Sequence, residues 1–148
     1  MKKTIKNEIR CTFLSRSENE ALARSIISGF LLPLDPDVEE LADLRCAVSE
    51  AVTNCIVHAY RDTIGLIYIT VSAEGNTVTV KIRDRGCGIS DVEKAKEPLF
   101  TTGGEERAGL GFAVMESFTD KLKVRSTVGK GTTVTMQKKI SVKYDRKK

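Results

Sequence analysis

The chain of 148 residues contains no tryptophan, a single histidine and four cysteines, and it has no long apolar segment. No apolar run approaches the roughly 18 residues needed to cross a bilayer, which argues against a membrane-spanning protein. The basic start is followed by Lys6, Glu8 and Arg10 instead of an apolar stretch, which argues against a secretory signal. We therefore expect a cytoplasmic protein that makes no contact with a membrane.

The cysteines are too widely spaced to form a recognisable metal or redox motif. Cys11, Cys46, Cys55 and Cys87 form no C-x-x-C pair, and His58 is the only histidine. These residues do not supply a plausible zinc site. We interpret the cysteines as reduced thiols that pack as small apolar side chains.

The composition is that of an ordinary soluble protein, with 41% hydrophobic and 30% charged residues. Because no repeat or linker interrupts the chain, we expect one domain over residues 1–148. The net charge is +4, and part of the excess lies in a basic tail at about 140–148. This tail has one aromatic residue, Tyr144, and no recognised motif, so we expect a solvated end and no direct contact with nucleic acid.

Hydrophobic periodicity predicts an α/β domain in which hairpins join most strands and helices cover one face of the sheet. The predicted strands are 5–14, 65–73, 77–83, 121–127 and 132–139. Helices are predicted at 18–32, at 36–60, in a short segment before Pro98 and from Gly109 onward, with a mobile loop at 100–109. The long helix is expected to take Asp35 as its N-cap, with Pro36 at its first position.

A polar face on the long helix is the first indication of chemistry. Glu50, Asn54 and His58 recur every four residues and fall together, across from most of the apolar stripe. The Glu50 carboxylate suits the acceptance of a proton from an attacking hydroxyl, or its orientation. The Asn54 amide suits one ligand position of a magnesium ion that keeps waters and phosphate oxygens. We interpret His58 as a structural or surface residue.

Three glycine-containing segments follow this helix, at residues 84–88, 109–111 and 129–133. Glycine lets the backbone approach a ligand closely or adopt positive φ. A glycine pair at a helix start offers N–H groups to phosphate, and Asp84 at a strand end can accept a hydrogen bond from an exocyclic amine. Each segment alone is more often an ordinary turn, so their order along the chain carries the argument.

In this order the segments resemble the nucleotide-binding motifs of the GHKL ATPase superfamily, which includes histidine kinases and Hsp90. Residues 50–59 resemble its N-box, 84–88 its adenine-site D-x-G-x-G box, 109–111 the G-x-G after the ATP lid and 129–133 the terminal G-x-G-T box. The resemblance spans the chain. It implies a two-layer Bergerat sandwich, with a mixed, mostly antiparallel sheet and helices on one face.

Within the superfamily, the sequence is most similar to the anti-sigma serine kinases. Residues 50–54, 98–102 and 109–116 carry this similarity, and residues 19–24 and 34–36 resemble its sporulation branch in particular. The resemblance implies a homodimer that binds Mg-ATP and holds a sigma factor of the sigma F type inactive. It also implies phosphorylation of a serine on an anti-anti-sigma factor.

The resemblance also implies a role for each matching residue. Glu50 would be the catalytic carboxylate, Asn54 the magnesium ligand and Asp84 the residue that recognises adenine. Arg107 would reach the γ-phosphate, and Arg24 would contact both the sigma factor and the anti-anti-sigma factor. The other residues expected to bind the nucleotide are Gly86, Gly88, Thr101, Thr102, Gly109, Leu110, Gly111 and Thr133.

Other functions remain open at this point. A general stress-response anti-sigma kinase would share the fold and differ in its partners, and a regulator could bind ATP and only sequester its target, although the presence of Glu50 argues against it. A sensor histidine kinase fits poorly, because His58 lies in the ATP-site helix and not on a dimerising helix pair. Hsp90-like and MutL-like ATPases need further domains. A basic nucleic-acid-binding module would show salt-dependent DNA binding.

Overall fold

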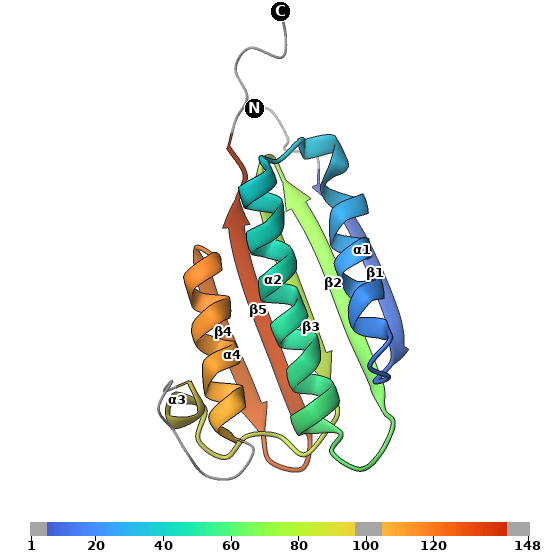
Figure 1. Ribbon diagram of the computed structural model, residues 1–148, viewed down its shortest axis with the longest axis vertical. Coiled ribbons are helices and arrows are strands. Elements are labelled where there is room, and N and C mark those ends of the chain that lie inside the picture. The colour runs from blue at the N-terminus through green and yellow to red at the C-terminus, as the bar shows by residue number, and fades with distance from the viewer. Residues whose placement is uncertain (1–5, 97–104, 142–148) are drawn as a thin grey trace, which may run out of the picture.

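The computed structural model describes residues 6–96 and 105–141, and for residues 105–109 it describes the backbone alone. Within them, five strands form one sheet in the spatial order β1-β2-β3-β5-β4, and every pairing is antiparallel. The strands are β1 (Lys6–Leu14), β2 (Leu66–Glu74), β3 (Thr77–Asp84), β4 (Lys121–Thr127) and β5 (Gly131–Lys139). Helices α1, α2 and α4 cover one face (Figure 1), which confirms the predicted two-layer α/β sandwich.

The core lies between the sheet and the helices. Alternate residues of the three central strands face the helices, so that Ile69, Ile82 and Val134 lie side by side and are buried. Burying one such side chain stabilises the fold by about 1.5–3 kcal/mol. The predicted alternation therefore fixes which face of each strand meets the helices, and the other face is left to polar residues.

Helix α2 (Val38–Asn54) is the central helix, and it packs against both α1 (Asn19–Leu31) and α4 (Glu105–Phe118). The predicted N-cap is wrong. Asp35 adopts a left-handed conformation after the 3-10 turn Leu32–Leu34, and the helix is capped by Asp37. Asp37 and Glu40 form a reciprocal capping box, which Asp35 cannot form because no acidic residue lies three positions after it.

The predicted helix at 36–60 is not α-helical throughout. It ends as α-helix at Asn54 and continues as a π-helical turn, η2 (Cys55–Ala59), in which the backbone N–H of Tyr60 donates to the carbonyl of Cys55 at 3.0 Å. A π turn accommodates more residues than an α turn and therefore changes the direction of the side chains that follow. Such turns occur frequently at functional sites.

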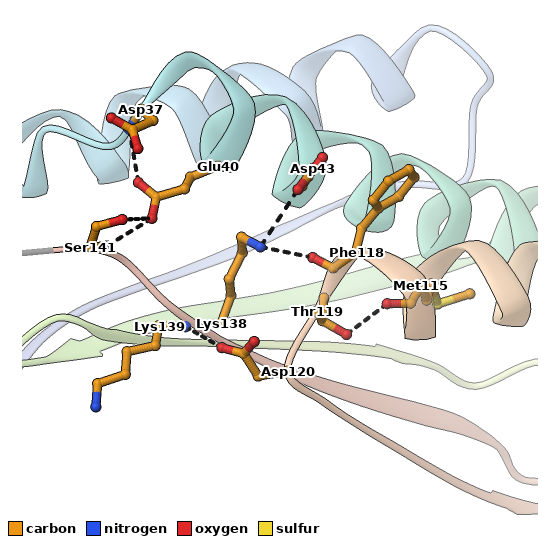
Figure 2. A network of polar contacts seen from close by, with 10 residues as sticks. All are labelled: Asp37, Glu40, Asp43, Met115, Phe118, Thr119, Asp120, Lys138, Lys139 and Ser141. Carbon is orange, nitrogen blue, oxygen red and sulfur yellow. Dashed lines mark hydrogen bonds and ion pairs between the residues drawn. The ribbon is translucent and has the colours of Figure 1, made fainter.

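One inward-facing lysine ties three elements together near the end of β5 (Figure 2). The Lys138 ammonium donates to the carbonyl of Phe118, at the end of α4, at 3.2 Å and lies 3.7 Å from the Asp43 carboxylate of α2. Its side chain is only 13% exposed, so this partner carboxylate offsets the cost of burying the charge. Beyond β5, the backbone N–H of Ser141 donates to Glu40 at 2.7 Å.

Candidate functional site

A cleft of about 210 Å³ opens between the helices and one end of the sheet. Its walls come from α2, the π turn, α4, the segment after β3 and the turn before β5. Most of the lining is apolar and includes Ile89 and Phe112, while Asn54 and Asp84 contribute polar groups. A mainly apolar cleft with a few fixed polar groups is typical of a small-molecule site.

Asp84, the last residue of β3, lies in this cleft and is only 5% exposed. Its Oδ1 accepts hydrogen bonds from the backbone N–H groups of Gly86 at 2.9 Å and Thr132 at 3.2 Å, and its Oδ2 accepts one from the Cys55 thiol at 3.5 Å. Burial raises the pKa of Asp84, although these hydrogen bonds act in the opposite direction. The result is a fixed acceptor in the cleft, suited to an amine donor.

The glycines at 86 and 88 are explained by close backbone contacts. A Cβ on Gly86 would lie 2.4 Å from the carbonyl oxygen of Ala59 in the π turn. Gly88 has φ +77, and a Cβ there would lie 2.3 Å from the carbonyl oxygen of Thr127. Both glycines therefore let the segment after Asp84 pack tightly, but of the two only Gly88 lines the cleft.

Asn54, Glu50 and Gly111 meet where α2 passes α4. A Cβ on Gly111 would lie 3.2 Å from Oε2 of Glu50 and 3.3 Å from Oδ1 of Asn54. The Asn54 Nδ2 is buried and has no hydrogen-bond partner among the described residues. A buried donor without a partner costs free energy, which a ligand can recover. Asn54 lines the cleft, whereas Glu50 lies one turn further from it and is not part of its lining.

The residues around Asn54 fit a magnesium ion that is bound mainly through a ligand's phosphates. In the part of the chain that the structure describes, no group of three or more His, Cys, Asp or Glu residues could hold a metal by itself. The protein oxygens near Gly111 are the Asn54 amide and the Glu50 carboxylate. Magnesium commonly takes one or two protein ligands and completes its shell with phosphate oxygens and water.

The sequence analysis expected Thr133 near Asp84 in the nucleotide site, but the structure places Thr132 in the cleft, and Thr133 is not part of its lining. Side chains alternate along β5, so Thr133 lies on the face of the sheet that is turned away from the helices. Thr132 lines the cleft, donates its backbone N–H to Asp84, and shares a hydrogen bond of 2.7 Å with the Ser126 hydroxyl. In a strand, residues two positions apart lie on the same face, and Val134 and Met136 are apolar and buried. This alternation in the sequence could have identified Thr132 as the threonine that faces the helices.

The predicted helix start at Gly109 is also wrong. Helix α4 begins at Glu105, within the segment predicted to be a loop, because residues 105–108 are good helix formers and acidic residues suit a helix start. The backbones of Arg107 and Gly109 therefore lie within the helix, and Leu110 is 51% exposed and outside the cleft lining. Thr101 and Thr102 lie outside the described residues.

His58 and Arg61 line the cleft, although the sequence analysis left them out of the chemistry. His58 belongs to the π turn and Arg61 follows it, so the local change in helical geometry decides where they point. No pattern of apolar residues identifies a single π turn, so the sequence could not predict that these two residues line the cleft.

Arg24 lies outside the cleft, on α1. Its guanidinium forms an ion pair with Glu20 one turn earlier, and Glu20 also accepts a hydrogen bond of 2.7 Å from the Ser49 hydroxyl of α2. The Arg24 side chain is 34% exposed. It is therefore held in position from both helices and remains accessible.

Comparison with known proteins now places the chain in a family. Residues 13–138 match the family described as "Histidine kinase-like ATPase domain". The anti-sigma F factor of Thermoanaerobacter sp. (strain X514) is 53% identical over 135 residues, which cover 90% of this chain and 94% of the relative. The anti-sigma F factor of Clostridium acetobutylicum is 45% identical over 142 residues, or 95% and 99% of the two chains. The chain belongs to the anti-sigma F factor family.

Solved structures agree with this membership at the level of the fold. A Mycobacterium tuberculosis protein with RsbU and RsbW domains has a TM-score of 0.69 at 20% identity, over 93% of this chain and 33% of its own. The histidine kinase domain of a blue-light activated kinase from Erythrobacter litoralis has a TM-score of 0.57 at 21% identity, over 82% and 60% of the two chains. At these identities the likeness establishes the fold alone.

Family membership identifies ATP as the ligand class of this anti-sigma F family member, since its domain is of the ATPase type. The cleft has the two polar features that such a ligand needs, an anchored acceptor at Asp84 and a buried donor at Asn54. None of the helices in the described residues is long and apolar enough to span a membrane.

Proposed function

We propose that the chain is an ATP-dependent protein serine kinase that phosphorylates an anti-anti-sigma factor and also holds a sporulation sigma factor of the sigma F type inactive. The observation that carries the kinase part is the arrangement at one end of the cleft. A buried amide at Asn54 and a carboxylate at Glu50 lie together against Gly111, beside an apolar cleft.

The described residues suit distinct roles in phosphoryl transfer. Asp84 would accept a hydrogen bond from the adenine amine, and Thr132 holds that carboxylate in place. Asn54 would bind magnesium through its amide oxygen, and the absent side chain of Gly111 lets the Glu50 carboxylate and the Asn54 amide approach the backbone of α4 closely. When bound, ATP would supply the phosphoryl group, and magnesium would neutralise negative charge on the phosphates. Glu50 would orient the partner's serine hydroxyl or accept its proton.

The partners are proposed from the family and from the position of Arg24. Relatives at 45–54% identity are anti-sigma F factors, which supports a sigma factor as the target. Arg24 is accessible and lies outside the cleft, so docking there leaves the nucleotide site open. We also propose that the working form is a homodimer and that Arg107 reaches the γ-phosphate.

The test uses the full chain with Mg-ATP and purified anti-anti-sigma factors of the sporulation and the stress-response types. We expect transfer of labelled phosphate to a serine of the sporulation protein. Glu50→Gln keeps the shape of the side chain and removes its basicity, so we expect ATP binding to persist while transfer falls by roughly 100-fold or more. Calorimetry measures the first property, and mass spectrometry of the phosphoserine measures the second.

Glu93→Gln is the matched control, because Glu93 is an exposed helical glutamate in α3 (Val92–Ala95) that is absent from the cleft lining. It should transfer phosphate at the wild-type rate. Transfer by Glu50→Gln at that rate would remove Glu50 from the chemistry. If the wild-type chain binds ATP and the sigma factor but phosphorylates neither protein, it is a sequestering regulator. Preferential transfer to the stress-response protein would change the assigned partners.

A further inference from the structure

The face of the sheet opposite the helices is strongly basic. Pairing in the five strands places Thr12, Tyr68, Arg83, Thr133 and Arg125 in one row across this face. The next row consists of Arg10, Thr70, Lys81, Thr135 and Lys123. None of the described helices covers these residues (Figure 1).

Charge is unevenly divided between this face and the rest of the protein. Ten cationic side chains lie on or border the described part of the face, against the three carboxylates Glu8, Glu74 and Asp84: Lys6, Arg10, Lys81, Arg83, Arg85, Lys121, Lys123, Arg125, Lys130 and Lys139. The face therefore carries +7 while the whole chain carries +4, so the remainder of the chain carries −3. Positive charge is thus concentrated on this face, in addition to the basic tail.

The charge is most concentrated around a hollow of about 270 Å³ at one end of the face, which we call the arginine hollow. Arg83, Arg85, Arg125 and Lys130 line it, and so do Asp84 and Thr132, which also line the cleft on the helical side. Among the described residues, no carboxylate forms an ion pair with any of these four cations. Four cations around one hollow, against the single and largely buried carboxylate of Asp84, favour an anionic ligand.

Tyr68 holds two of these arginines in place. The guanidinium carbon of Arg83 lies 4.5 Å from the centre of the Tyr68 ring, and that of Arg85 lies 5.2 Å from it. Such contacts restrict long side chains before a ligand binds, which lowers the entropic cost of binding. The planar guanidinium fork matches a carboxylate in a two-point contact, which a lysine cannot reproduce.

The composition of the hollow favours a protein over a nucleic acid. Tyrosine and arginine are the residues enriched at the centres of protein interfaces, where lysine is depleted. Single-stranded nucleic acid is usually bound by exposed aromatic rings that stack on bases. Tyr68 is the aromatic residue in these two rows, and its ring already contacts two guanidinium groups. A second copy of the chain would bring the same positive charges and is disfavoured.

We propose that the arginine hollow binds a carboxylate-rich segment of a partner protein, on the sheet face opposite the helices. The hollow adjoins the nucleotide cleft at Asp84 and Thr132, and Arg24 lines neither of them. The segment's carboxylates pair with the guanidinium groups of Arg83, Arg85 and Arg125, and Lys130 contributes at the rim. This surface goes beyond the proposed kinase function and requires neither nucleotide nor phosphoryl transfer.

The test measures fluorescence anisotropy of a labelled Glu-rich peptide with the full chain at physiological ionic strength. A peptide with Gln in place of each Glu and an oligothymidine of equal charge serve as comparison probes. We expect binding of the Glu-rich peptide to weaken roughly tenfold in the double variant Arg83→Gln/Arg125→Gln, since two charge-assisted contacts are lost. The matched control Lys121→Gln/Lys139→Gln removes equal charge from the other end of the face and should bind within about twofold of wild type.

Two further measurements separate this proposal from its alternatives. The double variant Arg83→Lys/Arg125→Lys keeps the charge, but its affinity for the Glu-rich peptide should still fall several-fold. Saturating ATP should leave the peptide affinity of the wild type unchanged. Equal losses in both double Gln variants would show diffuse attraction and overturn the site. Tighter binding of the oligothymidine than of the peptide would assign the face to nucleic acid instead. Unchanged thermal unfolding and ATP binding confirm that each variant is folded.

Discussion

At the scale of single residues, Asp84 shows how the fold fixes a charged acceptor in an apolar cleft. Two backbone N–H groups and one thiol hold its carboxylate, and burial raises its pKa. Because folding raises this pKa, ionised Asp84 lowers the stability of the protein at pH values above the raised pKa. This loss of stability disappears as the pH falls through the raised pKa toward the ordinary value of an aspartate. A group that is kept at such a cost in a cleft is a good candidate for ligand recognition.

We predict that Asp84→Asn weakens ATP binding by about 1–3 kcal/mol, because one acceptor oxygen becomes an amide donor. The wild-type affinity should also fall as acidification protonates Asp84, beginning at a higher pH than for an ordinary aspartate. The variant should lack this component of the pH dependence. Calorimetric titrations of both proteins across the acidic range measure the two effects.

Asp120→Asn is the control for this prediction, since Asp120 accepts a backbone hydrogen bond from Lys139 on an exposed part of the chain. It should bind ATP as the wild type does. Equal affinities of wild type and Asp84→Asn, in variants that unfold at similar temperatures, would remove Asp84 from adenine recognition.

At the scale of elements, hydrophobic periodicity predicted the strands and the central helix, because burial on one face is what the periodicity records. It could not predict where α2 becomes a π turn, since Cys55–Ala59 has the same apolar character in either helical form. It also missed the four residues of α4 before Gly109, where glycines suggested a boundary that helix-forming neighbours override. Thr132 and Thr133 were distinguishable by strand parity alone.

We predict that Gly111→Ala lowers ATP affinity several-fold while leaving stability equal or higher. The added methyl would lie 3.2 Å from Glu50 and 3.3 Å from Asn54, so these side chains must shift. Alanine is better than glycine in a helix by about 1 kcal/mol, which opposes any loss of packing. Thermal unfolding and calorimetry separate the two effects.

Gly29→Ala provides the matched control, because Gly29 lies in α1 and a Cβ there would meet no atom within 4 Å. That variant should gain stability in the same way and keep its ATP affinity. Normal affinity in Gly111→Ala would show that the space beside Asn54 is not used by the nucleotide.

At the scale of the whole molecule, the helical layer and the opposite face of the sheet present different surfaces. The helical layer and the adjoining ends of the sheet contain the nucleotide cleft, and Arg24 lies in the same layer on α1, outside the cleft. The opposite sheet face contains the basic surface around Tyr68. Separate surfaces allow nucleotide and partners to be bound at the same time, and any coupling between them is then measurable as a change in affinity.

We predict that Arg24→Glu weakens binding of both the sigma factor and the anti-anti-sigma factor, because a shared docking surface makes the two partners compete. The substitution also places like charge beside Glu20, yet ATP affinity and thermal stability should remain near wild type, within about 0.5 kcal/mol, as is usual at accessible positions. Surface plasmon resonance with each partner measures the outcome.

Arg16→Glu is a suitable control, since Arg16 is exposed, precedes α1 and makes no ion pair among the described residues. Loss of one partner alone in Arg24→Glu would refute the shared surface. Normal binding of both would place Arg24 outside the interface.

The Lys138 contacts have a mechanical consequence for the cleft. Lys138 connects the Phe118 end of α4 to Asp43 near the start of α2, whereas Gly111, next to Asn54, and Phe112, in the cleft lining, lie near the middle of α4. When a rigid helix is held at one end, its displacement grows with the distance from that end. A rotation of α4 about its Phe118 end would therefore change the spacing beside Asn54 more than the packing around Phe118.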